Sequence, residues 1–113
     1  MTFRSDPQTL ILSALSDGPK HGYAIVKAIK DRSEGVFKLS EGQLYPMLQT
    51  MLQKGLVSAN WETPVSGPAR KVYQLEPDGL KELEQKRVDW DQYTHAMKNM
   101  FQVPKPQTEG GNV

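Results

Sequence analysis

The residues of this 113-residue chain that are best suited to direct chemistry are amides and a hydroxyl, and not acids, bases or nucleophiles. Stepping about 100° per residue from Leu44 places them on one side of a predicted helix. That side carries Gly42, Gln43, Pro46, Gln49, Thr50 and Gln53. A solvated helix face usually carries Lys and Glu, whereas Gln and Thr suit hydrogen bonding to base edges. The face therefore indicates either a nucleic-acid contact or an ordinary polar surface.

Other kinds of site find little support in the sequence. The chain has no cysteine, which removes disulfides, thiolate metal sites and cysteine nucleophiles. Its two histidines, His21 and His95, fall in different predicted elements, so we expect no metal ion and no cofactor. No cluster of nucleophile, base and orienting group is visible, so we expect no enzymatic activity. No apolar run approaches about 18 residues, and we expect a soluble cytoplasmic protein without membrane contact.

The helix that carries the uncharged face has clear sequence signals at both ends. Ser40 with Gln43 three residues later forms a capping box, in which the hydroxyl and the amide satisfy free backbone N–H groups. Gly55 stands where a left-handed residue ends a helix. The buried stripe is predicted to be Leu44, Met47, Leu48, Met51 and Leu52. These signals predict one helix within Leu39 to Leu56.

Two helices precede this one and a hairpin follows it. Asp6 and Pro7 begin the first helix, which ends at Asp17 to Pro19, and the second runs from about His21 to Ser33. Two helices joined by a short connection, the second with a polar face, predict a helix-turn-helix. Val57, Ala59 and Trp61 alternate with polar residues and predict the inward side of a half-buried strand, and a second strand follows at RKVYQL, residues 70 to 75. The fold class is therefore mainly α with a small β-hairpin, a winged helix-turn-helix.

A long helix is predicted from Asp78 to Phe101. Leu83, Trp90 and Met97 recur every seven residues, with Phe101 flanking them. The hairpin formed by the two predicted strands, here called the wing, is too small to cover a helix of roughly 24 residues. The heptad seam of this helix needs another helix to pack against. We therefore expect a homodimer with Leu83, Trp90, Met97 and Phe101 at its interface. The predicted domains are a winged helix-turn-helix at 1 to 77, a dimerisation helix at 78 to 101 and a disordered tail at 102 to 113.

The charge distribution suits contact with phosphate in the N-terminal part. Residues 1 to 75 carry a net charge of +3 and residues 76 to 113 a net charge of −2. Tyr45, at the edge of the buried arc, is either a core tyrosine or a donor to phosphate. Arg70 and Lys71 are neighbours on a strand, so at most one of them can aim directly at a phosphate. The candidate DNA-binding residues are Lys38, Ser40, Gly42, Gln43, Tyr45, Pro46, Gln49, Thr50, Arg70 and Lys71.

Three segments together resemble the PadR family of bacterial transcription regulators: HGYAI at 21 to 25, EGQLYPMLQTMLQKGLV at 41 to 57, and GPARKVYQLEPDG at 67 to 79. The single C-terminal helix with a tryptophan at mid-length is similar to the short subfamily that includes multidrug-sensing repressors. The resemblance implies a homodimeric repressor that binds a palindromic operator on double-stranded DNA. It also implies release by a small aromatic effector. Gln43 stands where the family commonly has Thr, so its base preference is expected to differ.

The tryptophan of the long helix has two readings. On a heptad seam Trp90 can serve dimer packing alone, or, in a two-fold dimer, two indoles can form a slot for a flat aromatic molecule, as the resemblance implies. Arg87 either pairs with an acidic effector or with Asp91. The candidate effector-binding residues are Arg87, Trp90, Tyr93, Thr94 and Met97. The alternative function is a winged-helix protein-interaction module without DNA binding.

Overall fold

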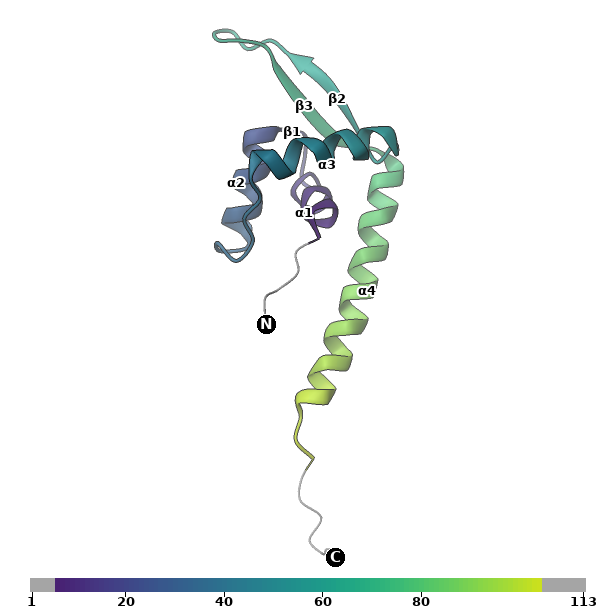
Figure 1. The fold of residues 1–113 in the computed structure, drawn as a ribbon. Helices are drawn as coiled ribbons and strands as arrows, with labels where there is room; N and C mark the ends of the chain where they lie inside the picture. The colour runs from purple at the N-terminus through teal and green to yellow at the C-terminus, as the bar shows by residue number, and fades with distance from the viewer. Residues whose placement is uncertain (1–5, 105–113) are drawn as a thin grey trace, which may run out of the picture.

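Four helices and three short strands make up residues 6–104, the part of the chain that the computed structural model describes (Figure 1). The helices are α1 (Pro7–Ala14), α2 (Gly22–Arg32), α3 (Glu41–Gln53) and α4 (Pro77–Phe101), and the strands are β1 (Lys20–His21), β2 (Val57–Glu62) and β3 (Arg70–Leu75). The expected fold class, mainly helical with a small β part and a long last helix, is confirmed. The predicted disordered tail falls from residue 105 onward outside the described residues. Within residues 6–104 no helix combines the length and the apolar character needed to cross a membrane.

The helix ends follow the sequence signals closely. The Asp6 carboxylate accepts a hydrogen bond from the Thr9 backbone N–H at the start of α1, and the Ser40–Gln43 capping box is complete at the start of α3. Gly55 ends α3 with φ of +74°, a conformation that glycine adopts without steric cost. Helix α1 is shorter than predicted, because it ends at Ala14 before the stop at Asp17.

The sheet has one strand more than the predicted hairpin. Strands β2 and β3 pair antiparallel over their whole predicted length, from Val57 opposite Leu75 to Glu62 opposite Arg70. The short β1 adds to the other edge of β3, giving the order β1-β3-β2. Two residues are too few to show an alternating pattern, so only their pairing with β3 identifies them as a strand.

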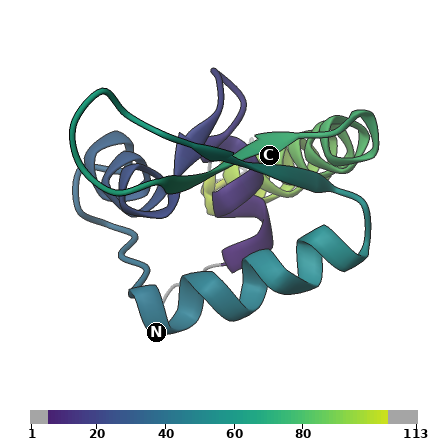
Figure 2. The ribbon, with the colours of Figure 1, turned by 90° about the horizontal axis from the view of Figure 1, so that it is seen from above.

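The core lies where α1, α2 and α3 meet the base of the sheet. Its buried hydrophobic residues are Ile11, Leu12, Ala14, Leu15, Ile25, Ile29, Leu39, Leu44, Leu48, Met51, Val57, Tyr73 and Leu83. Helix α1 is buried on more than one side, since it contacts α2, α3 and α4. Packing of this kind holds α3 at one edge of the molecule with its outer side uncovered (Figure 2).

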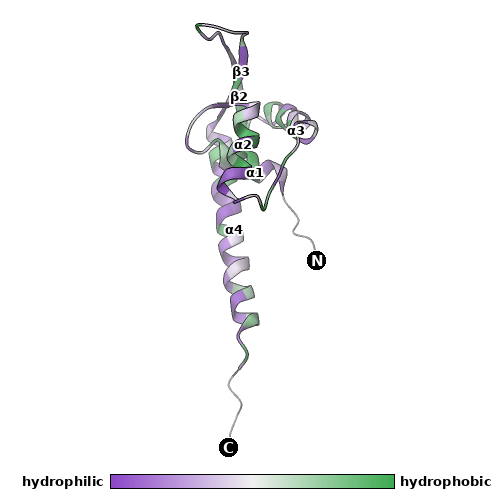
Figure 3. Ribbon diagram, turned by 90° about the vertical axis from the view of Figure 1, so that its left-hand side faces the viewer, coloured by the Kyte–Doolittle hydropathy of each residue, from purple (hydrophilic) through white to green (hydrophobic). Residues whose placement is uncertain are grey.

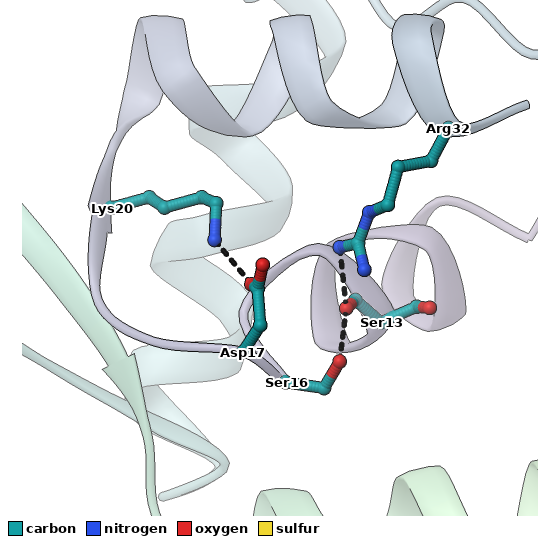
Figure 4. A network of polar contacts seen from close by, with 5 residues as sticks. All are labelled: Ser13, Ser16, Asp17, Lys20 and Arg32. Atoms are coloured by element: carbon teal, nitrogen blue, oxygen red, sulfur yellow. Dashed lines mark hydrogen bonds and ion pairs between the residues drawn. The ribbon is translucent and has the colours of Figure 1, made fainter.

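Polar contacts fix the end of α1 against α2 (Figure 4). The Arg32 guanidinium at the end of α2 donates to the Ser13 carbonyl oxygen at 2.8 Å, and the Ser16 hydroxyl donates to the same oxygen at 2.6 Å. In the connection that follows, Lys20 forms an ion pair with Asp17. The hydrogen bond from the Lys20 ammonium holds the pKa of the Asp17 carboxyl below its ordinary value. The Arg32 contact thus links the end of α2 to the end of α1.

Helix α4 begins at the base of the wing and runs away from the rest of the fold (Figure 3). Its first turns contact α1 and β3, and the Lys86 ammonium lies 4.0 Å from the Asp6 carboxylate. Leu83 is 5% exposed and belongs to the core of its own subunit, which corrects the prediction that it lies at a dimer interface. A side chain already enclosed by its own chain offers almost no surface to a second one. Hydrophobic residues nevertheless continue along α4 beyond this point (Figure 3).

Candidate nucleic-acid interface

The uncharged face predicted for α3 is on the surface. Gly42, Gln43, Pro46, Gln49 and Thr50 are all exposed, while Leu44, Leu48 and Met51 on the other side of the helix are buried. Lys38, in the segment that leads into α3, is exposed as well. The structure therefore places the five α3 residues that were predicted to contact bases on one exposed face of the helix, as the 3.6-residue period requires.

Gln43 takes part in the cap of the helix that it belongs to. Its Oε1 accepts hydrogen bonds from the Ser40 backbone N–H and the Ser40 hydroxyl, each at 3.1 Å, and its own backbone N–H donates to Ser40 Oγ at 3.2 Å. The two hydrogen bonds of the side chain thus use its carbonyl oxygen, and the amide NH₂ remains a donor group at the exposed start of α3. A bidentate contact to adenine needs both ends of the amide, so it requires the cap to open.

Helix α3 continues through Pro46 although proline cannot donate to the Gly42 carbonyl oxygen. The Thr50 hydroxyl donates to the Pro46 carbonyl oxygen at 3.2 Å. With its proton engaged in this way, the exposed Thr50 oxygen presents lone pairs, and its natural base partners are exocyclic amino groups. Gly42 leaves the first turn open, because a Cβ there would meet nothing nearer than Ser40 Oγ at 3.8 Å.

Tyr45 joins α3 to the start of α2. The Tyr45 side chain is 45% exposed, and its hydroxyl lies so close to Gly22 that a Cβ at this position would be 2.4 Å from the phenol oxygen. The ring therefore rests on the backbone of the first turn of α2, and only glycine allows this approach. The neighbouring Tyr73 is buried, and burial raises its pKa, with a smaller contribution from the charge of Tyr45.

The two basic residues of the wing lie on opposite faces, as predicted for neighbours on a strand. The Arg70 guanidinium is 3.5 Å from the Glu62 carboxylate, its partner across the sheet. The Lys71 ammonium lies 5.9 Å from the centre of the Tyr73 ring, on the face that joins the core. Arg70 is thus partly neutralised on the outer face, whereas Lys71 supplies a cation on the face that continues from the core.

Trp61 lies where strand β2 leaves the core. Val57, Ala59 and Trp61 share one face of the strand, as their alternation predicts, but burial on that face ends before Trp61, whose side chain is 70% exposed. The strand extends past the end of the core, so the described part of the chain leaves its last inward-facing residue mostly uncovered.

The residues proposed for an effector lie on the free part of α4. The Trp90 and Tyr93 rings stack with their centres 5.5 Å apart and are 62% and 54% exposed. Arg87 pairs with Glu84 at 3.2 Å, and not with Asp91 as the alternative reading supposed. The Thr94 hydroxyl oxygen is covered and has no hydrogen-bond partner among the described residues. Met97 is half-buried and Phe101 exposed farther along the helix.

A cavity of about 270 Å³ lies elsewhere, between α1 and α2 and beside Phe37, with Arg32 at its wall. None of the five candidate effector residues lines it. Among residues 6–104 no group of three or more His, Asp or Glu side chains is placed to bind a metal ion. Chemically, the described surface offers hydrogen-bonding groups on α3, a cation and an indole on the wing, and stacked aromatic rings on α4.

The sequence matches the model of the transcriptional regulator PadR-like family over residues 11–85. A curated relative, the transcriptional regulator YqjI of Escherichia coli, is 31% identical over 89 residues. That match spans 79% of this chain but 41% of YqjI, so this chain corresponds to less than half of that protein's length.

Solved structures show the same architecture. A PadR family transcription regulator from Clostridium difficile is 31% identical with a TM-score of 0.74, and the match covers 85% of this chain and 98% of that one. PadR from Bacillus subtilis, solved in complex with operator DNA, is 24% identical with a TM-score of 0.63, covering 89% of this chain and 50% of that one. At this identity the second comparison shows a shared fold.

Proposed function

The chain belongs to the PadR-like family of transcriptional regulators, and on this premise we propose that it is a homodimeric repressor of a palindromic operator, released by a small aromatic effector. In this proposal α3 of each subunit enters the major groove at one half-site, the two half-sites lying about one helical turn apart. The wings grip the flanking backbone. Residues 1 to 77 form the DNA-binding part and residues 78 to 101 the dimerisation helix.

One observation carries the DNA-binding part of the proposal, namely the exposed, uncharged face of α3 beside the wing. Gln49 and Thr50 present an amide and an acceptor oxygen there, and Pro46 and Gly42 leave the helix start narrow. Side chains of this kind read base edges in the major groove. The Bacillus subtilis PadR protein, which has the same fold, binds operator DNA, and this supports the same use of the fold here.

The dimer is supported by the free part of α4. One stripe of this helix packs on the subunit's own core at Leu83 and then continues to the exposed Trp90, the half-buried Met97 and the exposed Phe101. A second α4 related by two-fold symmetry would cover the stripe on both subunits at once. The palindromic operator follows from the same symmetry, because two identical recognition helices meet two identical half-sites.

The effector part rests on the aromatic pair of α4. In a two-fold dimer, the stacked Trp90 and Tyr93 rings of both subunits lie near the axis and offer flat apolar surfaces to an aromatic molecule. Arg87 offers a cation close by, and the Thr94 hydroxyl, which is covered in the single subunit, would have to turn outward to reach the ligand. Such a ligand releases DNA only if it binds better to the arrangement in which the two α3 helices no longer match the groove repeat.

Replacing Gln43 with alanine tests the base-reading role. We expect binding-site selection on the DNA upstream of its own gene to change at one base pair per half-site, and affinity for the wild-type site to fall about tenfold, because a bidentate adenine contact is lost. Quantitative mobility-shift titration measures both. Gln92→Ala, an exposed amide on α4, is the matched control and should behave as the wild type.

The cap needs a separate control, since Gln43 also accepts the Ser40 N–H. Gln43→Glu keeps a capping-box acceptor but removes the amide donor, so it should retain helix stability and still lose the adenine preference. An unchanged base preference in both Gln43 variants would contradict the assigned role. A wild-type protein that fails to bind the upstream DNA at low salt would contradict DNA binding itself.

Planar aromatic molecules are expected to quench the fluorescence of Trp90. The quenching should disappear in Trp90→Ala, where Trp61 alone supplies the remaining signal, because the ligand is held against the α4 indole and not near the wing. Fluorescence titration of the dimer measures this. Quenching that persists in Trp90→Ala would place the ligand elsewhere, and the effector site on α4 would be wrong.

A further inference from the structure

Trp61 has a large apolar side chain that the described part of its own subunit leaves mostly exposed. The strand register places it directly opposite Lys71, and the next pair inward is Ala59 opposite Tyr73. Along this face of the hairpin, exposure rises from 4% at Tyr73 to 70% at Trp61. The face thus leaves the core between these two residues, and its outer end carries one indole and one ammonium group.

This face of the wing lies on the same side as α3. At the base of the hairpin, Val57 and Tyr73 belong to the same core cluster as Leu44 and Leu48 of α3. The outer end of the hairpin rises past α3, as the ribbon shows in two directions (Figures 1 and 3). A duplex that lies across the outer side of α3 and extends beyond it therefore borders the inner face of the wing, where Trp61 and Lys71 project.

The charges on the two faces of the hairpin indicate what kind of partner fits its inner face. The acidic residue of β2, Glu62, pairs with Arg70 on the reverse face. The inner face is left with the Lys71 cation, which is the cross-strand partner of Trp61 and whose ammonium lies 5.9 Å from the centre of the Tyr73 ring. The backbone of DNA presents the complementary surface, with phosphates for the ammonium group and the apolar C–H faces of deoxyribose for the ring.

We propose that Trp61 is a DNA contact of the wing, packing its indole against a deoxyribose of the operator flank next to a phosphate that Lys71 holds. This assignment rests on the proposed DNA-binding function and adds to it a residue that carries no charge. Burial of the indole contributes affinity through its apolar area, while Lys71 contributes through counterion release. The two neighbours should therefore be separable by their response to salt.

The test compares Trp61→Ala, Trp61→Phe and Lys71→Ala in the full chain, on the operator fragment that the wild type binds, from 50 to about 200 mM salt. Trp61→Ala should weaken binding about tenfold with an unchanged slope of log affinity against log salt. Lys71→Ala should weaken binding and lower that slope by about one. Trp61→Phe should retain most of the affinity, because a ring still covers the sugar.

Fluorescence supplies a second readout. Addition of operator DNA should quench or shift tryptophan emission in the wild type, and the effect should be strongly reduced in Trp61→Phe. Wild-type affinity in Trp61→Ala would overturn the inference while leaving DNA binding intact. A lowered salt slope in Trp61→Ala would also overturn it, since the loss would then come from a disturbed wing. Absence of any DNA binding by the wild type would overturn both this inference and the proposed function.

Discussion

Replacing Gly79 with alanine is expected to lower the free energy of unfolding by about 3 kcal/mol, more than any other glycine substitution in the described chain. Gly79 is in the first turn of α4, where a Cβ would lie 2.0 Å from the Leu56 carbonyl oxygen and 3.2 Å from a methyl group of Leu75. The oxygen cannot move aside freely, because it accepts the Glu76 backbone N–H at 3.0 Å. Urea denaturation measures the change.

Gly42→Ala is the matched control for this prediction. Both glycines lie in the first turn of a helix, but a Cβ at position 42 meets only Ser40 Oγ, at 3.8 Å. The control should be neutral or more stable by up to about 1 kcal/mol, since alanine favours the helix. Equal stability of the two alanine variants would mean that the junction at Leu56 relaxes easily, and the argument from close approach would fail.

The contacts around Gly79 also connect the proposed DNA-binding face of α3 with the proposed effector site on α4. The Leu56 carbonyl lies between the end of α3 and the start of β2, and the Ser58 hydroxyl donates to the Glu76 carboxylate at 2.7 Å beside it. The start of α4 is therefore attached to α3 and to the wing through one short segment. A change in the direction of α4 has a direct route to α3 through these contacts.

The double substitution Met97→Glu with Phe101→Glu is expected to convert a dimer into a monomer and to weaken operator binding by a factor of at least about 100. Met97, which is half-buried, and Phe101, which is exposed, lie four residues apart on the stripe of α4 that continues from Leu83. Charges there would be buried without partners in a two-fold interface. A monomer binds its half-site without the gain in effective concentration that a linked second half-site gives. Sedimentation at micromolar concentration and mobility-shift titration measure the two effects.

The control places the same charges on the opposite side of α4. Gln92→Glu with Asn99→Glu changes two exposed residues about half a turn away from the stripe, and it should remain dimeric with nearly unchanged affinity. A wild type that sediments as a monomer would contradict the dimer directly. Dissociation by the control pair as well would show that net charge, and not the stripe, governs assembly.

Local patterns in the sequence were sufficient to place most elements. The start of α3 follows from Ser40 and Gln43, and the hairpin strands at 57 to 62 and 70 to 75 follow from alternation and the Gly/Pro loop between them. These signals act over a few residues, through backbone groups that side chains nearby satisfy. Strand β1 escaped prediction because two residues carry no period, and its existence depends on β3, far along the chain.

The candidate site shows the same division. The sequence alone predicted the uncharged face of α3 and the opposite orientations of Arg70 and Lys71. Both predictions depend only on the period of a single element. The structure added that Arg70 pairs with Glu62 and that Arg87 pairs with Glu84. The Arg70 pair depends on the register between β2 and β3, and the Arg87 pair on which side-chain orientation α4 adopts at the surface, and neither is given by the period of one element.

Leu83 and Trp61 mark the limit of sequence reasoning for this protein. Periodicity by itself determined which residues share a side of α4 and which share a face of β2. It assigned Leu83 to a second subunit and Trp61 to the inward side of a half-buried strand. In the tertiary structure the leucine is buried in its own subunit and the indole is mostly exposed. The physical reason is that a repeat fixes the direction of a side chain relative to its element, whereas burial depends on how far the other elements extend alongside it.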